Sequence, residues 1–448
     1  MKPRPLLALA LLALARVVGA QGAHPVSHAN EGLPVDAAPR AMYARESDPP
    51  LNKLHTLLFL AEVLPTEVGA SLPAEREREK LSDSEFFTGR WYFRDREDKE
   101  ITEQDRALFD GDVRTSPVFL IDHERGAKLR ELLSRIDTRE EVEAMESLRS
   151  PLPRVLLQWD LLSVWWRLEK ACKQTGPPAA EPETLAALAQ TIRALALPRS
   201  VLERLDAGTD ALVPTGDGVN RTLPYVPPAL LDGPRGAWRE IARDEKELFH
   251  ATNQLRAARV FVRAGTAQET ERLVALSAAA NDDATTPRLA VGTEAALVLS
   301  LVVLDDALEP CATNVVDEVR VRRVTGPAEL HPDNGSSRDG LSHWIYLLSR
   351  AGALLGDGPR FRFVPDTAQG LFLEYGSPKR TTYFAQCALC HRRTNAGGQD
   401  PDGIRALGRY GKPSIERDPA TRLRIAERQF APAVESLRGR LGLEPKRQ

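Results

Sequence analysis

Two cysteines and a histidine late in the sequence have the spacing that is used to attach haem covalently. Cys387 and Cys390 are three positions apart, and His391 follows directly. On a helix these positions share one face, so two thiols and one imidazole can meet a single flat porphyrin. The thiols would add to the haem vinyl groups, and the imidazole of His391 would be the proximal iron ligand. We therefore predict one haem c, held by Cys387, Cys390 and His391.

Two other kinds of site use the same residue types. A structural zinc ion needs a fourth ligand, and no second pair of Cys or His residues lies close to residues 387–391. A thiol redox centre places Cys-x-x-Cys at the start of a helix, after a strand of a βαβ unit, and the flanking sequence does not clearly supply one. Both alternatives stay open, and the pattern favours haem.

A haem of this kind requires export, and the first residues have the features of a signal peptide. Lys2 and Arg4 precede an apolar run over residues 6–15, and the small residues 18–20 offer a cleavage site. The apolar run is too short to span a bilayer, although an uncleaved membrane anchor is the alternative. We predict a signal peptide over residues 1–20 and a periplasmic or extracellular protein with no transmembrane segment after cleavage.

Composition and charge describe a large globular chain with an uneven charge distribution. The 448 residues are 42% hydrophobic, enough for two or three cores without a disulfide scaffold. Besides the motif cysteines there are Cys172 and Cys311, which either pair or stay as free thiols. Residues 377–448 hold 15 Lys and Arg against 7 Asp and Glu, a net charge of +8, and the remaining residues hold 45 against 56, a net charge of −11. The split predicts either docking of an acidic redox partner protein or attraction between two parts of the chain, and nucleic acid is a poor explanation for an exported protein.

The predicted fold class is α+β, arranged along the chain in successive regions. The predicted regions are a disordered linker over residues 21–50, a mainly helical domain over 51–206, a linker rich in Pro and Gly over 207–235, an α+β domain over 236–376 and a haem domain over 377–448. Residues 155–172 have the apolar pattern of a buried helix, and their aromatic residues fit core packing better than a cofactor site.

The α+β domain is predicted to contain an antiparallel sheet. Short apolar or alternating runs predict strands over residues 258–263, 296–304, 316–324, 343–348, 360–364 and 371–375. In residues 316–324, valines alternate with arginines, which is typical of a half-exposed strand. Thr266 and Glu269 predict a capping box at the start of a helix that ends near residue 280. Asp305 and Asp306 have the character of turn residues rather than metal ligands.

Residues 377–448 resemble a reduced class I cytochrome c domain, which is all-α. That family has a helix ending in the haem motif and a second helix packed across it, and residues 417–430, opened by Asp418 and Pro419, match the second helix. In the family a proline past the ligand histidine often supplies the carbonyl that accepts the proton of its Nδ1. The resemblance assigns this role to Pro401.

The sequence departs from that family at the second axial ligand. Class I cytochromes c use a methionine downstream of the motif, but no methionine or histidine follows His391 in this sequence. The sixth iron position is then filled by Tyr410 or Lys412, by a residue from an earlier domain, or by nothing stable. His343 and His250 are the favoured donors among the earlier residues.

The chain before the motif, over residues 51–376, is also similar to large exported bacterial proteins of unassigned function that end in a single Cys-x-x-Cys-His. That resemblance implies an architecture and no activity. Three functions follow from the sequence: electron transfer, a peroxidase-like haem enzyme or haem-based sensor with an open distal site, and a partner-binding protein with an accessory haem. We predict electron transfer, and we favour an electron carrier over an enzyme. No nucleotide-binding, zincin or nucleophile-elbow motif is found elsewhere.

Overall fold

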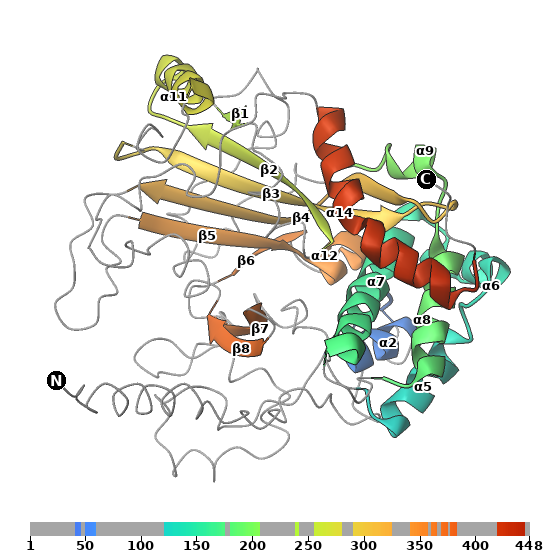
Figure 1. Ribbon diagram of the computed structural model, residues 1–448. Helices are drawn as coiled ribbons and strands as arrows, with labels where there is room; N and C mark the ends of the chain where they lie inside the picture. The colour runs from blue at the N-terminus through green and yellow to red at the C-terminus, as the bar shows by residue number, and fades with distance from the viewer. Residues whose placement is uncertain are drawn as a thin grey trace, which may run out of the picture.

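A computed structural model of the chain shows most of the described helices gathered at one end of an antiparallel sheet (Figure 1). The structure describes residues 41–45, 50–59, 121–174, 180–206, 238–241, 255–279, 290–324, 341–356, 360–364, 369–374, 377–382 and 419–443. The fold is α+β, as the sequence predicts. Residues 377–382 form a strand, so the prediction of an all-α domain from residue 377 is wrong at its start. The rest of the predicted cytochrome-like arrangement stays a prediction, because residues 383–418 lie outside the described part.

The helices come mainly from the first half of the described chain. They are α2 (Pro50–Phe59), α5 (His123–Leu133), α6 (Arg139–Ala144), the short 3-10 helix η4 (Glu146–Leu148), α7 (Pro151–Gln174), α8 (Pro182–Leu195) and α9 (Arg199–Leu202), followed later by α11 (Ala267–Ala279), α12 (Arg350–Leu355) and α14 (Pro419–Arg440). None of these helices, within the part of the chain that the structure places, is long and apolar enough to cross a membrane.

Helix α7 lies at the centre of the helical layer. It begins at Pro151, where a missing N–H costs nothing, and packs against α8, α9 and α12 as well as strand β3 (Glu294–Leu304). Because several elements surround it, Trp159 and Trp165 are both buried. This confirms that the aromatic residues of the helix belong to the core. Each such side chain contributes roughly 2–3 kcal/mol by its burial.

Residues 41–45 belong to the folded body, although they fall in the segment for which the sequence predicts disorder. The side chain of Asn52, in α2, accepts hydrogen bonds from the backbone N–H groups of Met42 at 3.0 Å and Tyr43 at 2.8 Å. Both Met42 and Tyr43 are buried. The apolar side chains and the amide of Asn52 outweigh the polar, Pro-rich composition that favours disorder.

The main sheet is an antiparallel meander in which each strand pairs with the next. Its order is β1 (Arg239–Ile241), β2 (Arg256–Arg263), β3, β4 (Pro310–Val324), β5 (Leu341–Leu348) and β6 (Phe361–Val364). A separate hairpin consists of β7 (Gln369–Glu374) and β8 (Ser377–Thr382). All six predicted strands are present, and the predicted capping box at α11 forms, with the Thr266 N–H donating to Glu269 at 2.9 Å and the Glu269 N–H donating to Thr266 at 3.2 Å.

Strand β4 is more deeply buried than the sequence predicts. Val319 and Val321 face the core and Arg323 is exposed, as expected for alternation, but Arg322, Asp317 and Glu318 are also buried. These charged side chains are buried because β4 lies between β3 and β5 and α14 packs against it. The prediction of a half-exposed strand is therefore wrong for Arg322, and Asp317 and Glu318 are buried charges that the prediction did not cover.

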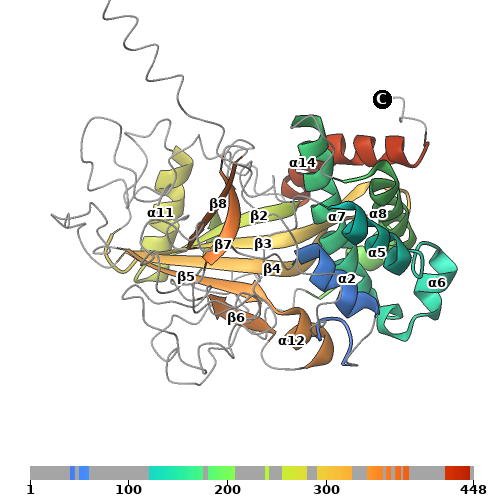
Figure 2. The same cartoon turned by 90° about the horizontal axis from the view of Figure 1, so that it is seen from below.

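Helix α14 begins at Pro419, two residues after the predicted start at Arg417, and continues ten residues past the predicted end at Phe430. It crosses the sheet beside the helical layer, as Figures 1 and 2 both show. Phe430, Val434 and Leu437 join one core cluster with residues of the helical region and of the main sheet. Described parts of all three predicted domains thus share a single core.

Candidate functional site

The residues predicted to bind haem lie almost entirely outside the described part of the chain. Cys387, Cys390, His391, Pro401 and the possible distal ligand His250 are not among the residues that the structure places, and neither are Tyr410 and Lys412. The exception is His343, whose backbone lies in β5 opposite Arg322 of β4. The motif itself begins five residues after β8 ends.

Two of the three methionines lie in described residues, and both contribute to the core. Met42 is buried, and Met145, between α6 and η4, is half-buried against the core cluster. The prediction that no methionine binds the iron is not tested by this, and stays a prediction.

A network of buried charges joins the helical layer to the sheet. It consists of Asp160 on α7, Arg350 at the start of α12, Asp317 and Glu318 on β4, and Arg256 on β2. Each of these side chains is at most 7% exposed. Burial at this level is costly for a charge unless opposite charges and hydrogen bonds compensate it.

The network alternates in sign along its length. The Arg350 guanidinium contacts both carboxylate oxygens of Asp160, from Nη2 to Oδ1 at 2.8 Å and from Nε to Oδ2 at 3.3 Å. Its Nη1 lies 3.6 Å from Asp317 Oδ1. Arg256 then pairs with Asp317 at 2.6 Å and with Glu318 at 2.7 Å. Glu318 also pairs with Arg320, so three carboxylates face three guanidinium groups.

Two aromatic side chains complete this network. The Tyr43 hydroxyl donates a hydrogen bond to Asp160. Burial, followed by the negative charge of Asp160, raises the pKa of Tyr43 well above its ordinary value, so its phenol stays protonated. The Trp159 ring lies beneath Arg256, at 5.2 Å from guanidinium carbon to ring centroid, and its Nε1 donates to the Leu255 carbonyl at 2.8 Å.

The contacts of the network compensate its buried charges. Its carboxylates accept from guanidinium groups and from the phenol of Tyr43, whose raised pKa keeps it protonated. Among the residues that the structure describes, no group of three or more His, Cys, Asp or Glu side chains could hold a metal ion. We assign the network to the alignment of α7, α12 and the sheet.

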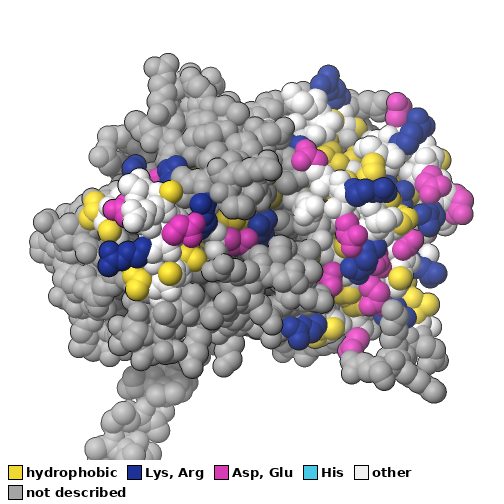
Figure 3. Space-filling model, turned by 90° about the horizontal axis from the view of Figure 1, so that it is seen from above, with side chains coloured by type: hydrophobic (Ala, Val, Ile, Leu, Met, Phe, Trp, Pro, Cys, Tyr) yellow, Lys and Arg dark blue, Asp and Glu magenta, His cyan; other side chains and the backbone are white. Residues whose placement is uncertain are grey.

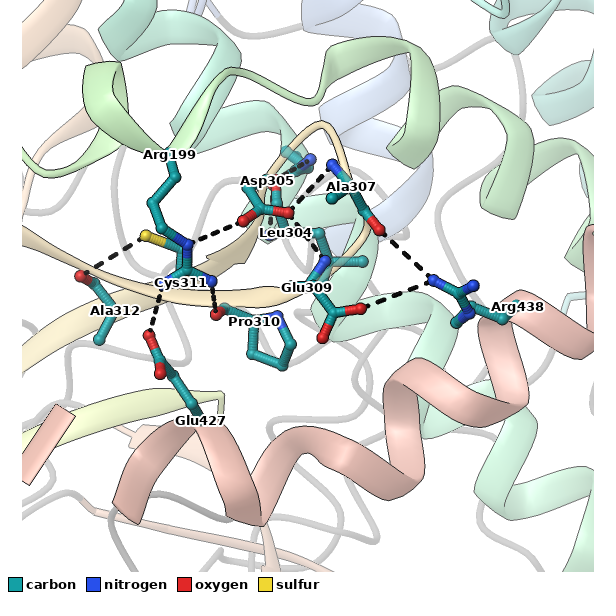
Figure 4. Close-up of polar contacts among 11 residues, drawn as sticks. Arg199, Leu304, Asp305, Ala307, Glu309, Pro310, Cys311, Ala312, Glu427 and Arg438 are labelled. Carbon is teal, nitrogen blue, oxygen red and sulfur yellow. Dashed lines mark hydrogen bonds and ion pairs between the residues drawn. The ribbon is translucent and has the colours of Figure 1, made fainter. Parts of the chain in front are cut away.

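A second ionic cluster lies where α9, the β3–β4 turn and α14 meet (Figure 4). Arg199 donates from Nε to Asp305 at 2.9 Å, from Nη1 to Glu427 of α14 at 3.0 Å and from Nη2 to the Pro310 carbonyl at 2.7 Å. Partial burial lowers the pKa of Arg199, but the hydrogen bond and charge of Glu427 outweigh it and raise that pKa above its ordinary value. The guanidinium is therefore a permanent charge that links three elements.

Asp305 has the role in the turn that the sequence predicts. Its Oδ1 accepts from the backbone N–H groups of Ala307 at 3.1 Å and Glu309 at 2.9 Å, which fixes the turn between β3 and β4. Asp306, the next residue, is exposed. The prediction that Asp305 is a turn residue is confirmed.

We expect Asp305→Ala to lower the free energy of unfolding by about 2 kcal/mol, because two turn hydrogen bonds and the buried partner of Arg199 are lost together. Urea denaturation with an unchanged m-value measures this. The neighbouring exposed Asp306→Ala is the matched control and should stay within about 0.5 kcal/mol of wild type. Equal effects of the two substitutions would show that the side chain of Asp305 does not hold the turn.

Cys311 lies next to this cluster and is a free thiol. Burial raises its pKa to about 12, so it stays protonated and is a poor nucleophile. Cys172, on α7, is half-buried and also free. Of the two alternatives that the sequence leaves open for this pair, the structure has the free thiols.

Gln158 is a further residue that positions these elements, and no sequence pattern pointed to it. Its amide donates to the carbonyls of Ile192 and Leu304, both at 3.0 Å, and accepts from the Leu304 N–H at 2.9 Å. One buried side chain on α7 therefore ties α8 to strand β3.

Comparison with known proteins adds no assignment to these sites, since no protein-family model, no curated protein and no solved structure matches the chain.

Proposed function

We propose that the protein is an exported monohaem protein of the c type whose role is electron transfer. The observation that carries the proposal is the order Cys387, Cys390, His391 in the sequence. With 4 cysteines and 8 histidines among 448 residues, this order would arise by chance about once in 2,000 shuffled chains. The amino-terminal signal peptide pattern supports it, because this kind of haem attachment requires export.

The donor set fits haem better than it fits a metal ion alone. Two thiols and one imidazole satisfy covalent attachment and one axial position, whereas a tetrahedral zinc site would need one more ligand. Cys387 and Cys390 would hold the porphyrin through thioether bonds, and the Pro401 carbonyl would accept the Nδ1 proton of His391 and so orient its ring. When bound, the haem iron would supply reversible one-electron transfer.

The place of attachment is limited by the chain itself. Cys387 follows the end of β8 by five residues, which extend over at most about 18 Å. The haem would therefore attach close to the end of the β7–β8 hairpin. The partner we propose is an acidic redox protein, because Arg392, Arg393 and their neighbours make residues 377–448 basic. On the face of the molecule in Figure 3, by contrast, basic and acidic side chains of the described residues are interspersed rather than separated.

A haem enzyme or sensor with an open distal site is the second candidate. One observation favours it, namely that no methionine or histidine follows His391 in the sequence. An iron without a stable sixth ligand could bind peroxide or a small gas molecule there.

An accessory haem on a partner-binding protein is the third possibility, and it predicts an iron that neither reacts nor exchanges electrons at a useful rate.

We expect optical spectra of the reduced protein to show that no methionine binds the haem iron. The spectrum should be either low-spin with two nitrogen ligands, which fits electron transfer, or high-spin with ready carbon monoxide binding, which fits the second candidate. In the first case, His343→Ala or His250→Ala should convert the spectrum to high spin and identify the donor. A sulfur-to-iron charge-transfer band in the oxidised protein that is removed by Met145→Ala would contradict the prediction, because it would show that Met145 binds the iron.

A further inference from the structure

We draw no further inference here: the strongest candidate, the side-chain cluster of Trp238, Arg263 and Glu294 where β2 ends and β3 begins, carries nothing because its two charged side chains already pair with each other and nothing in the described part of the chain shows what covers the buried indole.

Discussion

Replacing Cys387 and Cys390 together by alanine is expected to abolish covalent haem attachment. Two thioether bonds hold the porphyrin in the proposed site, and they survive acid and organic extraction, which release haem that is only ligated. Haem retained after extraction should therefore fall from about one per chain to none. Each single substitution should leave at most one thioether bond and much less holoprotein.

The chain carries its own control for this experiment. Cys172→Ala and Cys311→Ala remove the two free thiols that the structure places in the body, and they should leave extraction-resistant haem unchanged. If the double Cys387 and Cys390 variant kept its haem, or if the Cys172 and Cys311 variants lost theirs, attachment at residues 387–391 would be excluded.

Arg350→Met is expected to lower the free energy of unfolding by about 3–5 kcal/mol, the largest effect of any single substitution that we predict in the body. The guanidinium of Arg350 is 3% exposed and contacts Asp160 at 2.8 Å and Asp317 at 3.6 Å, which are themselves at most 3% exposed. Methionine fills a similar volume but leaves both carboxylates without this cation. Chemical denaturation followed by circular dichroism measures the change.

A matched control uses the same substitution on a surface ion pair. Arg139 lies 3.1 Å from Glu143, with both side chains at least 50% exposed, so Arg139→Met should cost less than about 0.5 kcal/mol. If Arg350→Met lowers the free energy of unfolding as little as Arg139→Met does, the buried network does not align α7, α12 and the sheet.

Strands and helix starts were predictable from the sequence because local patterns determine them. The apolar runs predicted β2 to β7 but not the short β1 or β8, and Thr266 with Glu269 predicted the capping box of α11. The end of α14 was not predictable in the same way. Pro432 is the kind of residue that ends a helix, and the helix continues only because Val434 and Leu437 find a core formed by distant residues.

The buried network shows a second limit of local patterns. Asp317 and Glu318 have the composition of a solvent-facing strand surface, and their pairing with Arg256 and Arg350 makes their burial favourable. Those partners come from other elements, far away in sequence. The haem motif is the opposite case, since three residues within the five positions 387–391 carry the prediction and no tertiary contact is needed to recognise it.

The central claim is that residues 387–391 bind haem covalently, and the most direct measurement is an optical spectrum of the full-length protein after acid and organic extraction. The protein should be produced with a haem c maturation system. We predict that one haem per chain remains and that its alkaline pyridine spectrum is that of a porphyrin with two thioether bonds. Complete extraction of the haem, or a purified protein that holds stoichiometric zinc in its place, would contradict the proposal.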